Sequence, residues 1–146
     1  MTPACVFCRV IAGDLPSNIV YRDDRTVAFL DRNPLFLGHS LVVPVALVDT
    51  LDDLAPAQVG PLFEVVRRTS IAVQRALGAG GSFVAANTRI SQSVAHVHVH
   101  VVPRNEGDGL FSPRPIWTRR TYASDAEAAE YAEKIRAAYP SGGASA

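Results

Sequence analysis

Three alternating histidines carry the clearest chemical signal in this sequence. His96, His98 and His100 are three of the four histidines in the chain, and valines separate them. On a β-strand, successive side chains point to opposite faces, so the imidazoles would share one face about 6.6 Å apart while the valines face a core. An imidazole serves near neutral pH as a nucleophile, proton donor, metal ligand or anion contact. The spacing therefore predicts a site for one small anion or a metal.

A second candidate lies near the N-terminus, where Cys5 and Cys8 form a C-x-x-C pair. Such a pair can be redox-active, zinc-binding or incidental. The first residues lack a basic-then-apolar signal pattern, and no apolar run approaches the length of a membrane span. We therefore expect a cytoplasmic protein without membrane contact, in which both thiols stay reduced.

The composition is that of a globular protein with balanced charge. The chain has 146 residues, of which 48% are hydrophobic and 19% charged, with 14 basic and 14 acidic side chains. A net charge of zero argues against a broad electrostatic footprint for nucleic acid or a membrane surface. Nucleotide-sized anions are still compatible, because they need only a local site.

The elements that must position these residues are short strands and two long helices. Besides the histidine strand, strands are predicted at 19–22, 26–30, 39–45 and 82–87, and helices at 9–12, 56–77 and 124–139. Loops at 31–38 and 88–95 precede the fourth histidine and the histidine strand. The order predicts an α+β fold with a mainly antiparallel sheet, in one domain over 1–140 and a disordered tail over 141–146.

The helix at 56–77 has the most regular apolar spacing in the chain. Asp52 or Asp53 is the expected cap at its start, and Gly78 is the expected stop. Seven residues are predicted to form its buried face: Val59, Leu62, Phe63, Val66, Ser70, Val73 and Leu77.

Taken in order, these motifs resemble the histidine-triad (HIT) family of nucleotide hydrolases and transferases. The family pattern is His-φ-His-φ-His-φ-φ, where φ is apolar, and residues 96–102 meet it at every position. Six further stretches match the family in the same order: 5–13, Asp23-Asp24, 28–31, Asn33-Pro34, Gly38-His39 and 41–44. The resemblance covers about residues 4–105.

The resemblance implies a sheet of about five antiparallel strands with flanking helices, continued across a homodimer. It also implies that His98 attacks the α-phosphorus of a nucleoside phosphate compound and forms a nucleotidyl-histidine, which water or another acceptor resolves. A neutral imidazole is a competent nucleophile near pH 7, so no alkoxide has to be generated.

The remaining site residues are carried over by the same resemblance. His96 and His100 flank the nucleophile, His39 lies beside the triad, and Asp31 accepts hydrogen bonds from both ribose hydroxyls. Asn87, Gln92 and Ser93 are the expected hydrogen-bond donors to the phosphate, and Ser93 is also expected to assist the leaving group. The expected lining of an apolar slot for the base is Val6, Phe7, Val10 and Phe29.

Two departures from the family pattern bear on these expectations. Some members hold zinc with the C-x-x-C pair, the first triad histidine and a histidine after the Val-Pro strand, where this chain has Leu47. Cys5, Cys8 and His96 are then one ligand short of a closed site, and Asp49 could complete it only if its loop shifted. Structural zinc at these residues stays an open alternative, but no cofactor is expected to be required. Ser91 stands where a glycine commonly precedes Gln92, which predicts altered backbone geometry in this loop.

Several alternatives stay open. The leading hypothesis is a hydrolase of dinucleoside polyphosphates or nucleoside phosphoramidates, the second a nucleotide-binding adaptor with little catalysis, and the third a metalloenzyme that uses the histidines as ligands. Base preference is undetermined. Segment 109–120, with three arginines and a tryptophan, could hold a second nucleotide or extra phosphates, dock on a dimer partner, or form a surface loop.

Overall fold

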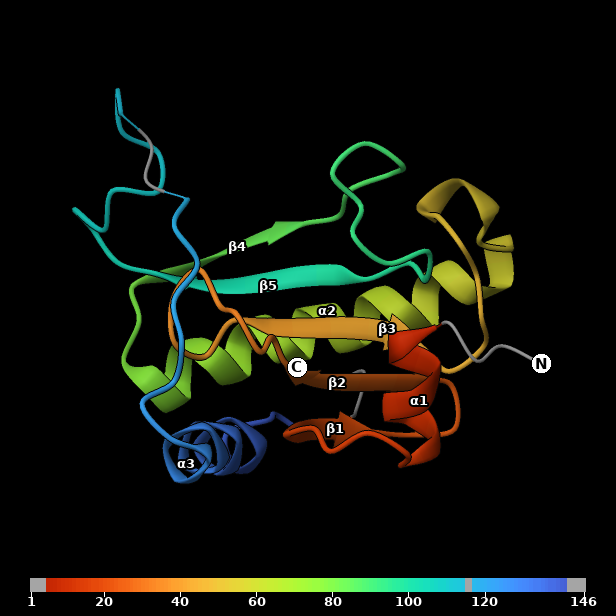
Figure 1. Ribbon diagram of the computed structural model, residues 1–146, viewed down its shortest axis with the longest axis horizontal. Coiled ribbons are helices and arrows are strands. Elements are labelled where there is room, and N and C mark those ends of the chain that lie inside the picture. The colour runs from red at the N-terminus through yellow and green to blue at the C-terminus, as the bar shows by residue number, and fades with distance from the viewer. Residues whose placement is uncertain (1–4, 115–116, 142–146) are drawn as a thin grey trace.

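The fold is a single antiparallel sheet with helices on both faces, as Figure 1 shows for the computed structural model, which describes residues 5–114 and 117–141. The strands run in the order β1-β2-β3-β5-β4. The elements are α1 (Val6–Ala12), β1 (Ile19–Arg22), β2 (Thr26–Leu30), β3 (Ser40–Pro44), a short 3-10 helix (Leu51–Asp53), α2 (Pro56–Leu77), β4 (Gly81–Ala85), β5 (Val99–Arg104) and α3 (Asp125–Ala137). The predicted α+β class and five-stranded sheet are confirmed. Of the predicted tail over 141–146, residues 142–146 lie outside the described residues.

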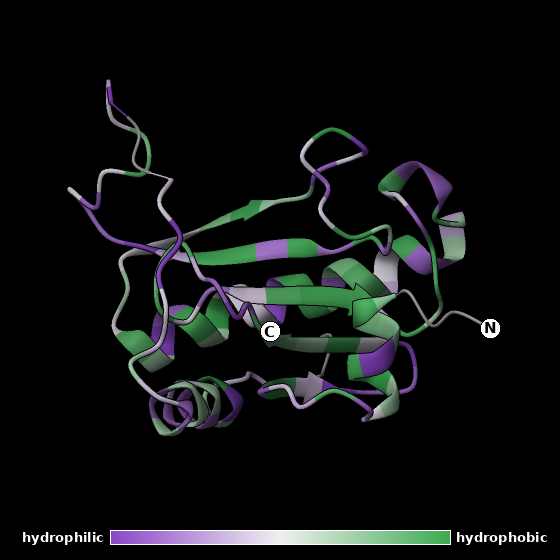
Figure 2. Cartoon of the chain, viewed as in Figure 1, coloured by the Kyte–Doolittle hydropathy of each residue, from purple (hydrophilic) through white to green (hydrophobic). Residues whose placement is uncertain are grey.

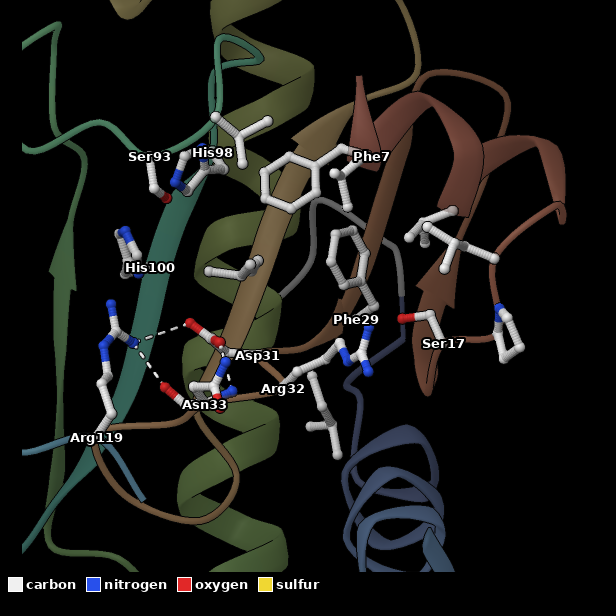
Figure 3. A pocket seen from close by; sticks show the side chains of 17 residues that line it. Phe7, Ser17, Phe29, Asp31, Arg32, Asn33, Ser93, His98, His100 and Arg119 are labelled. Atoms are coloured by element: carbon white, nitrogen blue, oxygen red, sulfur yellow. Dashed lines mark hydrogen bonds and ion pairs between the residues drawn. The ribbon is translucent and has the colours of Figure 1, made fainter. Parts of the chain in front are cut away.

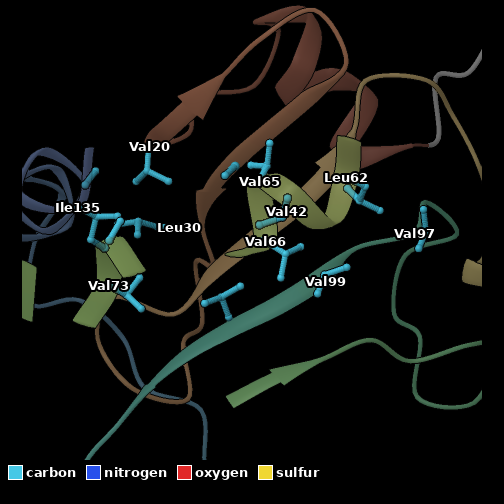
Figure 4. Packing of buried hydrophobic residues seen from close by; sticks show 14 of the residues in the cluster. Val20, Leu30, Val42, Leu62, Val65, Val66, Val73, Val97, Val99 and Ile135 are labelled. Atoms are coloured by element: carbon cyan, nitrogen blue, oxygen red, sulfur yellow. The ribbon is translucent and has the colours of Figure 1, made fainter. Parts of the chain in front are cut away.

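Alternation along the strands divides the core into two clusters, one on each face of the sheet. On β2, Ala28 and Leu30 face α2 and α3, whereas Val27 and Phe29 face α1. Figures 2 and 4 show the apolar strands and the packing of α2 against them. Val97, Val99 and Val101 belong to the α2 side, as the predicted alternation requires.

The histidine strand begins later than the sequence predicts. Its hydrogen-bonded pairing starts at Val99, so His96 and His98 lie in an extended segment that leads into β5. Within the sheet, His100 pairs with Leu41 of β3 and with Ala85 of β4. This register places His100 close to the start of β3, where His39 lies.

Helix α1 is longer than the predicted piece at 9–12. It begins at Val6 because the Cys5 side chain caps it, with Cys5 Sγ accepting a hydrogen bond from the Cys8 N–H at 3.2 Å. Gly13 ends the helix with φ 83°, a left-handed conformation that glycine adopts without strain. The longer helix brings Phe7 and the cysteine pair against the histidine segment.

Helix α2 has the predicted bounds, but its buried face is rotated from the predicted one. Val59 and Phe63 are exposed, and the residues that face the sheet are Leu62, Val65, Val66, Thr69, Ala72 and Val73. The expected cap by Asp52 or Asp53 is wrong, because both residues belong to the preceding 3-10 helix. Gln58 instead accepts a hydrogen bond from the Ala55 N–H through its side-chain oxygen, at 2.8 Å. Among the described residues, no helix combines the length and apolar character that crossing a bilayer needs.

The turn before β3 depends on Gly38. Its φ is +99°, a region that L-residues rarely adopt, and its N–H donates to the Tyr122 hydroxyl at 2.9 Å. A Cβ at this position would overlap Leu77 Cδ1 at the end of α2. Gly38 thereby sets the path of the backbone into His39.

We expect Gly38→Ala to lower the free energy of unfolding by about 2 kcal/mol or more, because it combines left-handed strain with a steric overlap. Gly60→Ala is the matched control. Gly60 is exposed inside α2, and a Cβ there meets nothing within 4 Å, so this variant should gain about 0.5–1 kcal/mol. Urea unfolding of both variants tests the prediction, and an equal effect of the two substitutions would contradict it.

Candidate functional site

A cavity of about 390 Å³ opens between α1, the end of β2 and the histidine segment. Its apolar end is lined by Val6, Phe7, Val10 and Phe29, and its polar end by Asp31, Ser93, His98 and His100 (Figure 3). The structure therefore brings the predicted base-slot residues, the predicted ribose carboxylate and two triad histidines to one cavity.

His98 presents an unprotonated ring nitrogen to this cavity. Its Nδ1 lies 2.8 Å from the His96 carbonyl oxygen, which can only accept, so Nδ1 carries the proton. Burial lowers the pKa of His98 and keeps the ring neutral, although the hydrogen bond to His96 opposes the shift. The Nε2 lone pair is therefore available, and Phe7 packs edge-on against the ring at 5.0 Å between centroids.

A chain of hydrogen bonds sets the opposite polarity at His100. The Leu35 N–H donates to His39 Nδ1 at 3.0 Å, so the proton of a neutral His39 is on Nε2. That nitrogen donates to His100 Nδ1 at 2.9 Å, which leaves the proton of His100 on its Nε2. His100 is thus a hydrogen-bond donor, suited to a phosphoryl oxygen, where His98 is a lone-pair donor.

Both members of this pair are neutral for electrostatic reasons. Burial, followed by the positive charges of neighbouring groups, lowers the pKa of His100 to about 4 and holds the pKa of His39 well below its usual range. His39 Nε2 also lies 3.7 Å from Asp31 Oδ2. With a neutral imidazole this contact is no ion pair, and the shorter bond to His100 decides the orientation of His39.

Asp31 lies at the end of β2, where it borders the cavity. One carboxylate oxygen, Oδ1, accepts the Asn33 N–H at 2.9 Å, and the other, Oδ2, accepts Nη1 of Arg119 at 3.0 Å. Arg119 also lines the cavity and was not predicted as a site residue. It is 88 positions away in sequence, and only the count of arginines in segment 109–120 hinted at it.

Four predicted site residues do not line the cavity: Gln92, Asn87, His96 and the buried His39. Gln92 donates from Nε2 to the carbonyl oxygens of Asp49 and Val94, at 2.6 and 3.1 Å, so its amide donors are used within the loop. Asn87 donates to the Ser91 carbonyl at 3.2 Å. His96 is buried and faces the cysteines, although it orients His98 through its carbonyl oxygen. The substrate contacts of these residues stay predictions, and in the structure none of the four borders the cavity.

The loop before the histidine segment contains two residues with left-handed backbone conformation, Arg89 with φ 65° and Ser91 with φ 62°. Ser91 thus adopts the conformation that a glycine at this position would take most easily. The Gln92 side-chain oxygen accepts the Arg89 N–H at 2.8 Å and braces the same turn. Gln92 and Asn87 therefore shape the loop that delivers Ser93 to the cavity.

Cys5, Cys8 and His96 form a separate cluster beside the start of α1. The two sulfur atoms lie 3.4 and 3.6 Å from His96 Nδ1. His96 Nε2 lies 2.8 Å from the Pro44 carbonyl oxygen, so Nδ1 carries the lone pair that faces the thiols. In the part of the chain that the structure describes, no fourth histidine, cysteine or carboxylate joins them. The donor set fits three positions of a tetrahedral zinc site, in which zinc would tie α1 to the histidine segment.

Comparison with known proteins agrees with the fold and the triad. The model of the HIT domain matches residues 12–107. The adenylylsulfatase HINT3 of Arabidopsis thaliana is 33% identical over 134 residues, which cover 90% of this chain and 68% of that protein. The asymmetrical bis(5'-nucleosyl)-tetraphosphatase of Schizosaccharomyces pombe is 34% identical over 94 residues, 63% of this chain and 52% of that one. This chain belongs to the HIT family, as its motifs predicted.

Among solved structures, a zinc-bound histidine triad family protein from Mycobacterium smegmatis superposes with a TM-score of 0.78. It is 35% identical to this chain, and the match covers 92% of each. The likeness supports the HIT fold for this chain.

The four lowered histidine pKa values predict a pH-dependent stability. Since burial depresses the pKa of each folded imidazole, the unfolded chain binds more protons below about pH 6.5. Stability is full above that pH and is lost as the pH falls toward about 4, the pKa of His100. We expect His100 alone to account for about 1–2 kcal/mol between pH 7 and pH 5. Urea titrations at several pH values should show that the free energy of unfolding depends less on pH in His100→Gln than in the wild type. Parallel curves for the two proteins would contradict this prediction.

The three-ligand cluster predicts a gain in zinc affinity when a fourth ligand is added. Leu47 follows Pro44, whose carbonyl already contacts His96, by three residues. We expect Leu47→His to tighten zinc binding by about tenfold or more, a gain of at least ~1.4 kcal/mol. Competition with a chromophoric chelator measures the affinity, and Leu47→Ala is the control for loss of the leucine. Equal affinities in the two variants would show that position 47 lies too far from the cluster.

Proposed function

We propose that this protein is a nucleotide hydrolase that cleaves at the α-phosphorus of its substrate through a nucleotidyl intermediate on His98. One observation carries the proposal. Within the described residues, the protein engages His98 only through Nδ1, so the unprotonated Nε2 faces a cavity with an apolar end and a polar end. A nucleophile in this tautomer needs no general base to become reactive.

The steps follow from the tautomers. The base occupies the slot beside Phe7 and Phe29, and Asp31 accepts the ribose hydroxyls. His98 Nε2 forms a bond to the α-phosphorus as the bond to the leaving group breaks and its electron pair departs with that group. His100 donates from Nε2 to a phosphoryl oxygen, where charge concentrates. Water then attacks the phosphorus, releases the nucleoside monophosphate and restores His98.

Ser93 completes the phosphate end of the cavity. Its side chain lines the same surface as His98 and His100, and a hydroxyl can give a hydrogen bond to the leaving group as the bond breaks. Gln92 and Asn87 enter this scheme as residues that shape the Ser93 loop rather than as phosphate donors. His96 enters as the residue whose carbonyl fixes the His98 tautomer.

The names of two relatives support the hydrolase class, since one is an adenylylsulfatase and the other a bis(5'-nucleosyl)-tetraphosphatase. Dinucleoside polyphosphates and nucleoside phosphoramidates are therefore the proposed substrates, and the name of the first relative adds adenylyl sulfate to them. All three place a leaving group on the α-phosphorus of a nucleotide, which is the bond that His98 would attack.

The proposal includes a homodimer joined at a sheet edge. Strand β4 forms one edge of the sheet, and its Val84 is exposed. An exposed apolar strand edge has unpaired backbone groups that favour pairing with a second copy.

His98→Ala should lower kcat/KM by at least about 10³-fold on whichever of these substrates the wild type turns over, because it removes the nucleophile. Nucleoside monophosphate binding should persist, as measured by calorimetry. Denaturation at alkaline pH during turnover should also trap a nucleoside monophosphate on the peptide that contains His98, detected by mass spectrometry. Turnover that survives in His98→Ala would contradict the mechanism, and binding without turnover in the wild type would favour the adaptor role.

A further inference from the structure

Arg119 reaches the cavity from outside the part of the chain that the HIT domain model matches, residues 12–107. It belongs to segment 109–120, whose role the sequence left open. The structure places it beside Asp31, and Figure 3 shows its guanidinium directed toward Asp31 and His100. This position makes it a candidate for a contact with the substrate.

The backbone around Arg119 is held in place by its neighbours. The Arg120 N–H donates to the Pro34 carbonyl at 2.7 Å, and Arg120 Nε donates to the Leu35 carbonyl at 2.9 Å. The Arg120 guanidinium also lies over the Phe36 ring, 5.1 Å from its centroid. Upstream, the Trp117 ring packs edge-on against Phe83 of β4, with 6.0 Å between the ring centroids. The segment is thus docked on its own chain on both sides of Arg119.

The guanidinium of Arg119 bonds to the described part of the protein through one of its three nitrogen atoms. Nη1 donates to Asp31 Oδ2 at 3.0 Å and to the Asn33 carbonyl at 2.9 Å. Among residues 5–114 and 117–141, Nε and Nη2 have no hydrogen-bond partner, and about half of the side chain is exposed. Since a guanidinium has five N–H donors in a rigid fork, three of them are left for a ligand.

The charge of the cavity makes an oxyanion the natural partner. Burial keeps His98 and His100 neutral, so they bring no positive charge to a phosphate. Within the described chain, Arg32 and Arg119 are the cations that line the cavity, and Asp31 is the carboxylate. Arg119 lies close enough to act electrostatically on both triad histidines. A negative charge between His100 and Arg119 would therefore be favoured.

We infer that Arg119 is a specificity-determining residue that binds the anionic leaving group of the substrate, a phosphate chain or a sulfate. The inference rests on the proposed function. Phosphoryl transfer places the nucleophile and the leaving group roughly in line, so the leaving group lies away from His98 Nε2. Arg119 borders the cavity on the His100 side, away from the slot formed by Phe7 and Phe29 (Figure 3). As the P–N bond forms and the P–O bond breaks, the leaving oxygen gains charge that the guanidinium stabilises.

The test compares leaving groups that share one nucleoside. The leaving groups of diadenosine tetraphosphate and adenylyl sulfate are anions, whereas the leaving group of adenosine phosphoramidate departs as neutral ammonia. Arg119→Gln should lower kcat/KM on the anionic pair by about tenfold or more beyond any loss on the phosphoramidate, because only the anionic leaving groups lose charge-assisted hydrogen bonds, whereas the contact of Arg119 with Asp31 is shared by all three substrates. A loss of kcat/KM on the polyphosphate alone would show that the site binds phosphate chains. A loss on adenylyl sulfate as well would show that it binds oxyanions in general.

A binding readout keeps the inference testable without turnover. The affinity ratio of ATP to AMP, measured by calorimetry, should fall about tenfold in Arg119→Gln. Arg119→Lys should restore part of the ratio, since it keeps the charge but loses the fork. Arg67→Gln on the surface of α2 is the matched control and should leave the ratio unchanged, because Arg67 pairs with Glu64 alone among the residues that the structure describes.

The outcomes separate the two proposals. An equal loss on all three substrates, with an unchanged ATP to AMP ratio, would mean that Arg119 only positions Asp31 and would overturn the inference. No change in either measurement would overturn it too. If the wild type turned over none of the substrates but the affinity ratio still fell in Arg119→Gln, the hydrolase proposal would fail while Arg119 remained the contact for the distal phosphates.

Discussion

The structure of the site depends on one buried histidine. His39 lies between the turn that precedes β3 and the imidazole of His100, and it accepts from the Leu35 N–H while it donates to His100. A buried imidazole without partners would be costly, so both hydrogen bonds also stabilise the fold. The positive φ of Gly38 and the pairing of β3 with β5 are what bring the two rings to 2.9 Å between nitrogens.

The same residue type obtains three different properties from its backbone surroundings. A carbonyl oxygen holds His98 through Nδ1 and leaves Nε2 bare, whereas another holds His96 through Nε2 and leaves Nδ1 bare. His100 accepts from His39 and so keeps its proton on Nε2. A lone pair that faces the cavity, a lone pair that faces the thiols and a hydrogen-bond donor therefore follow from which ring nitrogen the protein engages.

Local patterns in the sequence predict the fold well, and long-range contacts explain where they fail. The alternation from His96 to Val102 predicts the division between core and site, and the HIT resemblance predicts the sheet and the cavity. The orientation of Gln92 could not be predicted, because it depends on a carbonyl 43 positions away. The earlier start of α1 depends on a thiol that acts as a cap, a role in which cysteine is not among the preferred residues. The contact of Arg119 with Asp31 joins parts of the chain that no periodicity relates.

The burial that keeps His98 and His100 neutral also leaves the cavity without positive charge from these two histidines. Nucleotide substrates differ mainly in the charge beyond the α-phosphorus, so recognition of that charge has to come from other residues. A segment outside residues 12–107, which the HIT domain model matches, can supply it without disturbing the tautomers at His98 and His100, provided that its backbone is docked independently. The hydrogen bonds of Arg120 to the 34–35 turn meet that condition, and they tie the segment to the same turn whose Leu35 N–H orients His39.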